Sequence, residues 1–241
     1  MSIRCVSPSE INLFFQCPYK WKLLYLDKVS KIRVRNEKAE LGTNIHEIIA
    51  KYYSSLPTKI DATRLEKHAT RCFSTYFEPY LIKFEKQAKE IINNFVKFEK
   101  SCLGNYVRPV LIEKYLKSPE FKGKIDYFDG KNIIDWKTGA IMQIGYNEMR
   151  QGKIYETLLR HNGYIKDGQK VNVMFVTLKN DRILKLPLVT LSWLMEQKRR
   201  MERIIESGRF SKIHSPLCNW DEVQLRCEFE GEKLWDKIQL F

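Results

Sequence analysis

The sequence predicts an α/β fold, because helical patterns precede and follow a group of short strands. Residues 121–128 alternate apolar and polar side chains around a β-branched centre, and residues 131–136 form a second β-rich run. Asp129-Gly130 between the two runs is a hairpin turn signal. The chain has 241 residues, which is enough to bury a full core. We therefore expect a single unit over residues 1–241.

Start signals place the first helices. Ser7 is a helix N-cap and Pro8 suits the first turn, so we expect a helix there that continues through Cys17. A second helix is expected to begin at Gly42, with His46 on its apolar side. The other expected elements are helices at 61–80 and 84–103, a strand at 110–116, a helix at 146–161, strands at 171–178 and 182–187, and a helix at 191–206.

The composition is strongly basic. Lys and Arg number 42 against 29 Asp and Glu, which gives a formal net charge of +13. Such an excess favours a polyanionic partner, with nucleic acid the first candidate and a membrane surface an alternative. No apolar run approaches the length of a membrane span, and the N-terminus lacks the apolar core of a signal peptide. We therefore expect a cytoplasmic protein, in the host cytoplasm if it is viral.

Two acidic residues and a lysine in the hairpin predict a reactive site. Antiparallel pairing would bring Asp126 and Asp135 together, and two neighbouring carboxylates favour a hard divalent cation such as Mg²⁺ between them. Lys137 lies two residues after Asp135, so both side chains project from the same face. A metal beside an ammonium group suits phosphodiester hydrolysis. Taken alone, however, the Asp-x-Lys triplet also fits an ordinary salt-bridged hairpin.

Four motifs in order extend this pattern. They are Gly42-Thr43-Asn44-Ile45-His46-Glu47, then Asp126 in Gly-Lys-Ile-Asp, then Asp135 with Lys137, and then Gln151-x-x-x-Tyr155. The ordered set resembles the PD-(D/E)XK nuclease superfamily, and within it the RecB/AddB-like branch. That branch includes CRISPR-associated RecB-like nucleases and small viral exonucleases. The resemblance spans about residues 7–230.

The resemblance implies an architecture. It implies a restriction-endonuclease-like core, a mixed β-sheet flanked by helices, over residues 109–206. A helical part over residues 1–108 would carry the first motif as an N-terminal insertion. The cysteine-containing segment 207–241 would pack back on the N-terminal helix.

The resemblance also implies roles for individual residues. His46, Asp126 and Asp135 would bind Mg²⁺ or Mn²⁺, with the backbone carbonyl of Trp136 as a further ligand. Lys137 would orient the attacking water, while Gln151 and Tyr155 would position the substrate or the lysine. Glu113, in the strand before the hairpin, could supply another carboxylate, but an exposed strand glutamate explains it equally well.

The implied activity is a metal-dependent deoxyribonuclease that leaves 5′-phosphate and 3′-hydroxyl ends. Relatives of this size favour an exonuclease on single strands or DNA ends. The sequence lacks a G-x-x-x-x-G-K-[ST] phosphate loop, so no ATPase motor is expected in the chain. The alternative is a DNA-binding nuclease subunit active only within a larger complex, such as CRISPR adaptation or viral recombination. A homo-oligomer also fits, and the Lys- and Ile-rich composition suggests a viral or archaeal source.

The C-terminal cysteines suggest a second cofactor. Cys218, Asp221 and Cys227 follow the spacing C-x2-D-x5-C, whereas relatives with an iron–sulfur cluster have three cysteines there and a fourth where Cys17 stands. Three alternatives remain. A [4Fe–4S] cluster could use all four residues, it could use the three thiolates alone, or the site could be degenerate. The preserved spacing of the three cysteines favours a cluster.

Overall fold

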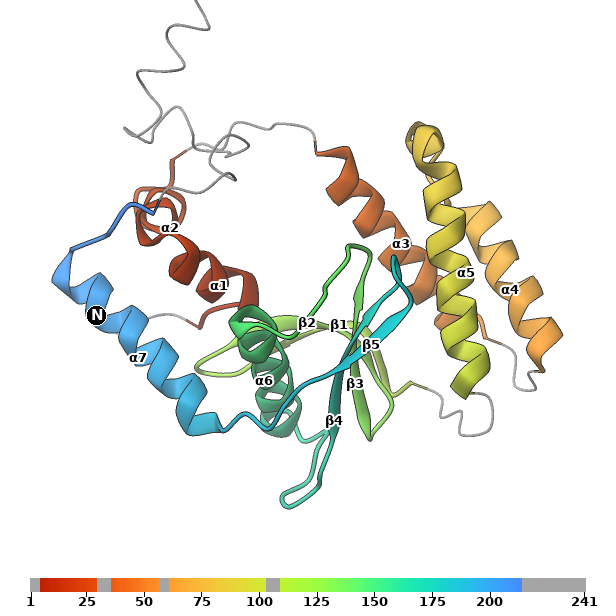
Figure 1. The fold of residues 1–241 in the computed structure, drawn as a ribbon. Helices are drawn as coiled ribbons and strands as arrows, with labels where there is room; N and C mark the ends of the chain where they lie inside the picture. The colour runs from red at the N-terminus through yellow and green to blue at the C-terminus, as the bar shows by residue number, and fades with distance from the viewer. Residues whose placement is uncertain (1–4, 30–35, 57–60, 103–108, 214–241) are drawn as a thin grey trace, which may run out of the picture. The chain divides into compact units, whose positions relative to one another are not determined.

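The structure is a computed structural model, and it describes residues 5–29, 36–56, 61–102 and 109–213. The chain divides into two compact units (Figure 1). The central unit comprises Asn36–Val189. The terminal unit combines Met1–Arg35 with Thr190–Phe241. Within the described residues, no helix is long and apolar enough to cross a membrane.

The central unit is built on a mixed five-stranded sheet with the spatial order β1-β2-β3-β4-β5. The β3–β4 pair is parallel, and the other three neighbouring pairs are antiparallel. These features confirm the expected mixed sheet flanked by helices. The strands are β1 (Leu111–Lys117), β2 (Lys122–Phe128), β3 (Asn132–Lys137), β4 (Asn172–Thr177) and β5 (Arg182–Lys185).

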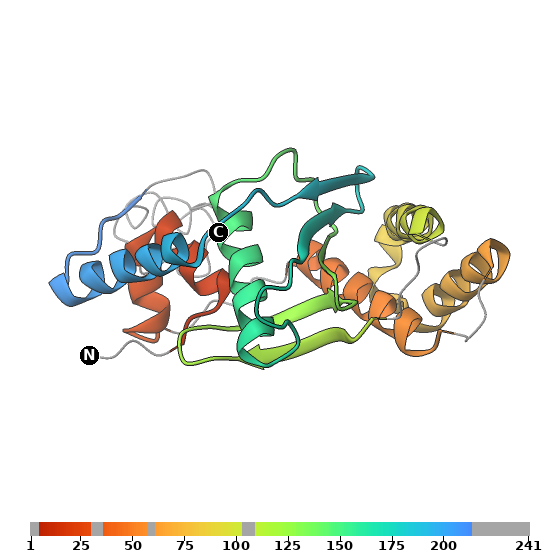
Figure 2. The same cartoon turned by 90° about the horizontal axis from the view of Figure 1, so that it is seen from below.

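Within the central unit, helices flank the sheet, and most of them form one group beside it (Figures 1 and 2). A single apolar core joins that helical group to the sheet through Tyr127, Ile134, Trp136 and Val176. The helices of the group are α3 (Glu37–Ser54), α4 (Ala62–Tyr76), the 3₁₀ helix η1 (Pro79–Phe84) and α5 (Glu85–Cys102). They match the helical insertion that was expected before the strands.

Helix α6 (Tyr146–His161) packs on the other face of the sheet, and a glycine brings it close. A Cβ atom on Gly152 would lie 2.8 Å from Leu186 Cδ2 and 2.9 Å from Val173 Cγ1. Carbon atoms do not approach so closely, so only glycine allows this helix–sheet distance. Because Gln151 precedes Gly152, the same close approach holds Gln151 over the strands.

The first two expected helices each differ from the structure at a boundary. Helix α1 (Pro8–Gln16) ends before Cys17, whose φ of −157° is extended, and α2 (Pro18–Tyr25) begins after it. The predicted continuous helix is wrong because a residue before proline is driven out of the helical region. Helix α3 begins at Glu37 rather than Gly42, since the Asn36 side chain accepts a hydrogen bond from Ala39 N and caps the helix.

The terminal unit packs α7 (Leu191–Ser207) with the N-terminal helices. The ring of Phe15 lies 5.6 Å from the Arg200 guanidinium, and Trp21 stacks on Phe210 at 6.3 Å. Gly208, in the left-handed conformation with φ of 66°, ends α7 as the sequence predicts. Cys218, Asp221 and Cys227 lie outside the described residues.

We predict that Glu99 makes stability depend on pH. Its side chain is buried between Tyr52 and Tyr53, whose hydroxyls donate to it at 3.3 and 2.6 Å, and burial raises the pKa of Glu99 to about 7. The folded state therefore holds a proton that the unfolded chain releases above its ordinary pKa of 4.5. Stability should fall by about 3 kcal/mol between pH 4.5 and 7 from this group alone.

Urea unfolding of the native chain and Glu99→Gln between pH 4.5 and 8 tests this prediction. The glutamine variant should lose that part of the pH dependence, while Glu66→Gln on the exposed surface of α4 should keep it. Equal pH dependence in the native chain and Glu99→Gln would contradict the assignment.

We also predict that Gly152→Ala destabilises the central unit. Alanine favours a helix by about 1 kcal/mol over glycine, but overpacking against Val173 costs about 1 to 3 kcal/mol. A net loss of stability is expected because the branched Val173 side chain cannot swing away. Gly139→Ala is the matched control, since its Cβ would meet nothing within 4 Å. If Gly152→Ala were as stable as Gly139→Ala, the interface between α6 and the sheet would have space for a methyl group.

Candidate active site

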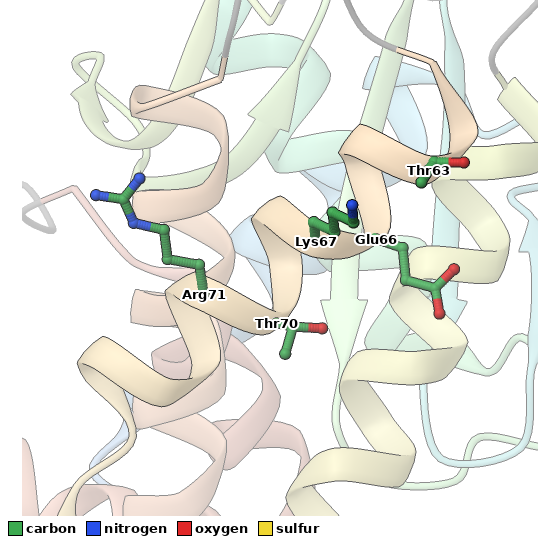
Figure 3. A pocket seen from close by; sticks show the side chains of 5 residues that line it. All are labelled: Thr63, Glu66, Lys67, Thr70 and Arg71. Carbon is green, nitrogen blue, oxygen red and sulfur yellow. The ribbon is translucent and has the colours of Figure 1, made fainter.

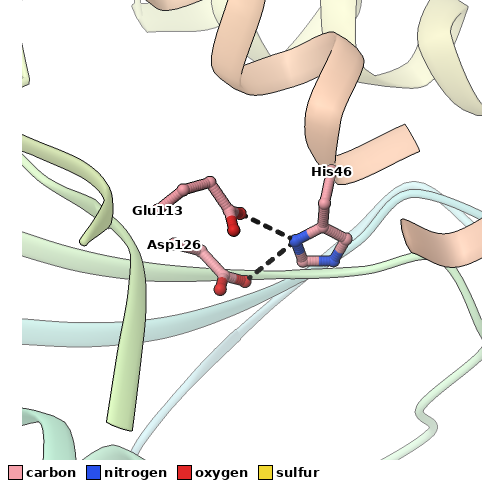
Figure 4. A group of neighbouring side chains, drawn as sticks. All are labelled: His46, Glu113 and Asp126. Carbon is pink, nitrogen blue, oxygen red and sulfur yellow. Dashed lines mark hydrogen bonds and ion pairs between the residues drawn. The ribbon is translucent and has the colours of Figure 1, made fainter. Parts of the chain in front are cut away.

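Three side chains from three elements converge beside the sheet (Figure 4). His46 of α3 places its Nδ1 atom 3.1 Å from Glu113 Oε1 and 3.5 Å from Asp126 Oδ2. One potential ligand atom from each residue lies within 4.8 Å of the other two. Among the described residues this is a group of acidic and histidine side chains close enough to share one metal ion.

The strand register explains why Glu113 meets Asp126. The pairs Ile112–Tyr127 and Lys114–Ile125 flank them on β1 and β2, so the two carboxylates face each other across the hairpin. Glu113 also has a φ of 48°, which is unusual for a residue other than glycine. Residues held in such conformations cluster at functional sites, because surrounding structure must maintain them.

Asp126 and Asp135 are both buried and lie on neighbouring strands. The Trp136 backbone N–H donates to Asp126 Oδ2 at 3.1 Å, which links β2 to β3 at this point. Burial, with the nearby charge of Asp135, raises the pKa of Asp126 to about 8. The two carboxylates thus resist simultaneous ionisation unless a positive charge joins them.

His46 lies next to these carboxylates and offsets their negative charge. Burial alone would lower the pKa of its imidazole, but the hydrogen bond to Glu113 and the charges of Asp126 and Asp135 raise it to about 9. The imidazole therefore carries a proton where the carboxylates gather. A divalent cation would replace that proton and satisfy the same carboxylates.

Lys137 is held by three contacts. Its Nζ atom lies 2.7 Å from Asp135 Oδ2, donates to Gln151 Oε1 at 2.9 Å, and sits 5.4 Å from the centre of the Phe175 ring. These contacts come from β3, α6 and β4. The ammonium group consequently has a fixed position next to the carboxylate cluster.

Gln151 bridges this lysine to the acidic group. Its Nε2 atom donates to Asp135 Oδ1 at 2.6 Å and to the Tyr155 hydroxyl at 2.8 Å. Burial, together with the charges of Asp135 and Asp126, raises the pKa of Tyr155 well above its usual range. The neutral Tyr155 hydroxyl and the Gln151 amide thus form one wall of the site.

The structure brings together six of the side chains expected from the sequence, which are His46, Asp126, Asp135, Lys137, Gln151 and Tyr155. Trp136 contributes its main chain, since its indole is buried in the core on the other face of β3. Cys17 belongs to the terminal unit, where its Sγ atom accepts a hydrogen bond from Lys20 N at 3.4 Å.

The sequence reasoning left one residue of this group open and missed another. Glu113 was left open there, although the Ser118-Pro119-Glu120-Phe121 turn could have fixed its register opposite Asp126. Phe175 was not considered at all, because no sequence pattern predicts that an apolar strand residue will contact a lysine.

The arrangement fits a divalent cation. Oδ2 of Asp135 is buried and receives no hydrogen bond from a described residue, its contact with Lys137 being an ion pair outside hydrogen-bond geometry. A buried carboxylate oxygen of this kind calls for another positive partner. The remaining donors are carboxylate oxygens and one imidazole, a set that suits Mg²⁺ or Mn²⁺.

Two hollows of the described surface lie away from this site. One of about 570 Å³ runs along α4 and is lined by Thr63, Glu66, Lys67, Thr70 and Arg71 (Figure 3). Another of about 290 Å³ lies between α6, β4 and the segment after β5. Neither is lined by a residue of the carboxylate–lysine cluster.

Comparison with known proteins places this site in a family. No curated protein matches the chain. A solved structure titled "Crystal structure of SSO0001" is 15% identical, covers 78% of this chain and 96% of its own, and has a TM-score of 0.31, too low to establish a shared fold. The family model described as the PD-(D/E)XK nuclease superfamily matches residues 5–230. Since that match spans nearly the whole chain, the protein belongs to the PD-(D/E)XK nuclease superfamily.

Proposed function

We propose that this protein is a Mg²⁺- or Mn²⁺-dependent deoxyribonuclease of the RecB/AddB-like branch. It hydrolyses phosphodiester bonds to 5′-phosphate and 3′-hydroxyl ends, and it acts as an exonuclease on single strands or DNA ends. The observation that carries the proposal is the buried pair Asp126 and Asp135 beside a fixed Lys137. The net charge of +13 supports a polyanionic substrate.

The metal would be held by His46, Glu113, Asp126 and Asp135, with the Trp136 carbonyl as a further ligand. When bound, a divalent cation lowers the pKa of a coordinated water and neutralises charge on the phosphate. Glu113 joins the proposed ligands because its carboxylate lies beside His46 and opposite Asp126.

The chain itself orients the reacting groups. Asp135 and the Phe175 ring both contact the Lys137 ammonium group and hold it in place. From that position it attracts the phosphate and orients the attacking water. Gln151 prevents the lysine from swinging away, since one amide binds both Lys137 and Asp135. Gln151 is thus a positioning residue, and Tyr155 supports it.

The other expectations stay predictions. A cluster on Cys17, Cys218, Asp221 and Cys227 is still proposed as a structural link, although three of these residues lie outside the described part of the chain. A homo-oligomer, a cytoplasmic location and a viral or archaeal source are likewise proposals. So is the alternative role as a subunit active only in a CRISPR-adaptation or viral recombination complex.

We predict that Asp135→Ala and Lys137→Ala each lower DNA cleavage by about 100-fold or more, because the first removes a proposed metal ligand and the second removes a positive charge that stabilises the transition state. The measurement uses single- and double-stranded DNA labelled at either end, with Mg²⁺, Mn²⁺ or EDTA. Glu66→Gln on α4 serves as the control and should cleave like the native chain. The position of the label in the products reveals the end from which degradation starts.

The outcomes separate the alternatives. Metal-dependent cleavage by the isolated chain supports the nuclease role. Cleavage that needs added partner proteins supports the subunit role. Cleavage unaffected by both substitutions would mean that another site does the chemistry.

Metal binding gives a readout independent of cleavage. We predict that Mn²⁺ at about 100 times its dissociation constant stabilises the native chain by about 2.7 kcal/mol. Asp126→Asn should unfold at a higher temperature than the native chain without metal, because it removes repulsion from Asp135, and it should respond less to Mn²⁺. Glu66→Gln should match the native chain in both measurements. A full Mn²⁺ response in Asp126→Asn would remove Asp126 from the ligand set.

A further inference from the structure

The face of the β1–β2 hairpin that carries the carboxylate cluster continues beyond it. Antiparallel pairing sets Tyr115 opposite Lys124 and Lys117 opposite Lys122. Because side chains alternate between faces, these two pairs lie on the same face as Glu113 and Asp126. The hairpin thus presents three successive rows: an acidic pair, a tyrosine–lysine pair and a lysine–lysine pair.

The rows are continuous with the metal site. Successive rows lie about 7 Å apart, because each strand residue rises about 3.4 Å. Lys124 forms an ion pair with Glu113 across the first gap. A chain that left the carboxylate cluster along this face would therefore meet Lys124 first, with Tyr115 beside it, and then Lys117 and Lys122.

Tyr115, Lys117 and Lys124 are exposed and Lys122 is half-buried, while other residues of the hairpin are anchored in the core. Tyr115 is 58% exposed, so its ring can be reached by a ligand from solvent. In contrast, Leu116, Phe121 and Ile125 of the same hairpin are buried. The hairpin keeps its shape through those apolar residues, while Tyr115, Lys117 and Lys124 can be reached from solvent.

We propose that this face is a track for single-stranded DNA leading to the metal site, an inference that rests on the proposed nuclease function. The lysines bind successive phosphates, and Tyr115 stacks against a base. A positive groove with an aromatic platform is the usual device for holding a single strand without sequence preference. A single strand is favoured over a duplex, because only an unpaired base offers its face to Tyr115.

Binding to a fluorescent 20-nucleotide oligothymidine in EDTA tests the track without cleavage. Tyr115→Ala should weaken binding by about tenfold. The double variant Lys117→Ala/Lys122→Ala should lower the slope of log affinity against log salt by about 1.4, or about 0.7 for each phosphate contact. Lys114→Ala is the matched control, because Lys114 pairs with Ile125 and projects from the other face of β1. It should change affinity by no more than about twofold.

Three results would overturn the proposal. The first is that Lys114→Ala weakens binding as much as Lys117→Ala or Lys122→Ala does singly. That result would indicate nonspecific electrostatic attraction to the whole surface. The second is unchanged affinity in Tyr115→Ala. The third is equal binding of a blunt duplex with the same dependence on Tyr115. The Mn²⁺ response of each variant is measured in parallel, so that a misfolded variant is recognised and replaced by Tyr115→Ser or Lys117→Gln/Lys122→Gln.

The same preparations separate this proposal from the nuclease proposal. If Asp135→Ala abolishes cleavage but the hairpin variants bind like Lys114→Ala, the track fails and the nuclease role stands. If the hairpin variants lose binding as expected but the native chain cleaves nothing, the nuclease role fails and the chain binds single strands through this face.

Discussion

The repulsion among three carboxylates is the constraint on which the rest of the site depends. Glu113, Asp126 and Asp135 lie on three adjacent strands, and the last two are buried. Burying like charges together costs free energy unless positive groups accompany them. His46 of α3 contacts Glu113 and Asp126, Lys124 of β2 contacts Glu113, and Lys137 of β3 contacts Asp135. The local charge balance is therefore distributed over several elements, and the site exists only in the folded chain.

The helical insertion holds His46 in position next to these carboxylates. Two residues earlier on α3, Asn44 is buried, donates to Tyr76 O at 2.8 Å and accepts from Glu78 N at 3.2 Å. These bonds attach α3 to the junction between α4 and η1. On the sheet side, a Cβ added to Gly42 would lie 3.1 Å from Thr138 Oγ1, so α3 approaches the end of β3 closely. The insertion thus fixes the position of His46 as well as covering the core.

The sequence was informative where a pattern is local. Alternation and the Asp129-Gly130 turn predicted the hairpin and the meeting of Asp126 with Asp135, and the spacing of Gln151 and Tyr155 put both on one face of α6. The sequence was less informative where tertiary contacts determine which residues meet. Glu113 acquires its role through the register of β1, and Phe175 through the parallel pairing of β3 with β4. The break at Cys17 was readable from Pro18, but the apolar residues on both sides obscured it.

The strand that carries Asp135 and Lys137 is stabilised from its opposite face. Trp136 lies between them in sequence, so its indole projects into the helical core, where it packs edge-on against Phe95 at 5.4 Å and Phe98 at 5.3 Å. One face of β3 therefore supplies apolar packing that offsets the unfavourable charge burial on the other. Because the two faces belong to the same strand, a loss of packing around Trp136 would displace Asp135 and Lys137 together. Precision at the site thus depends on a core residue that touches no substrate.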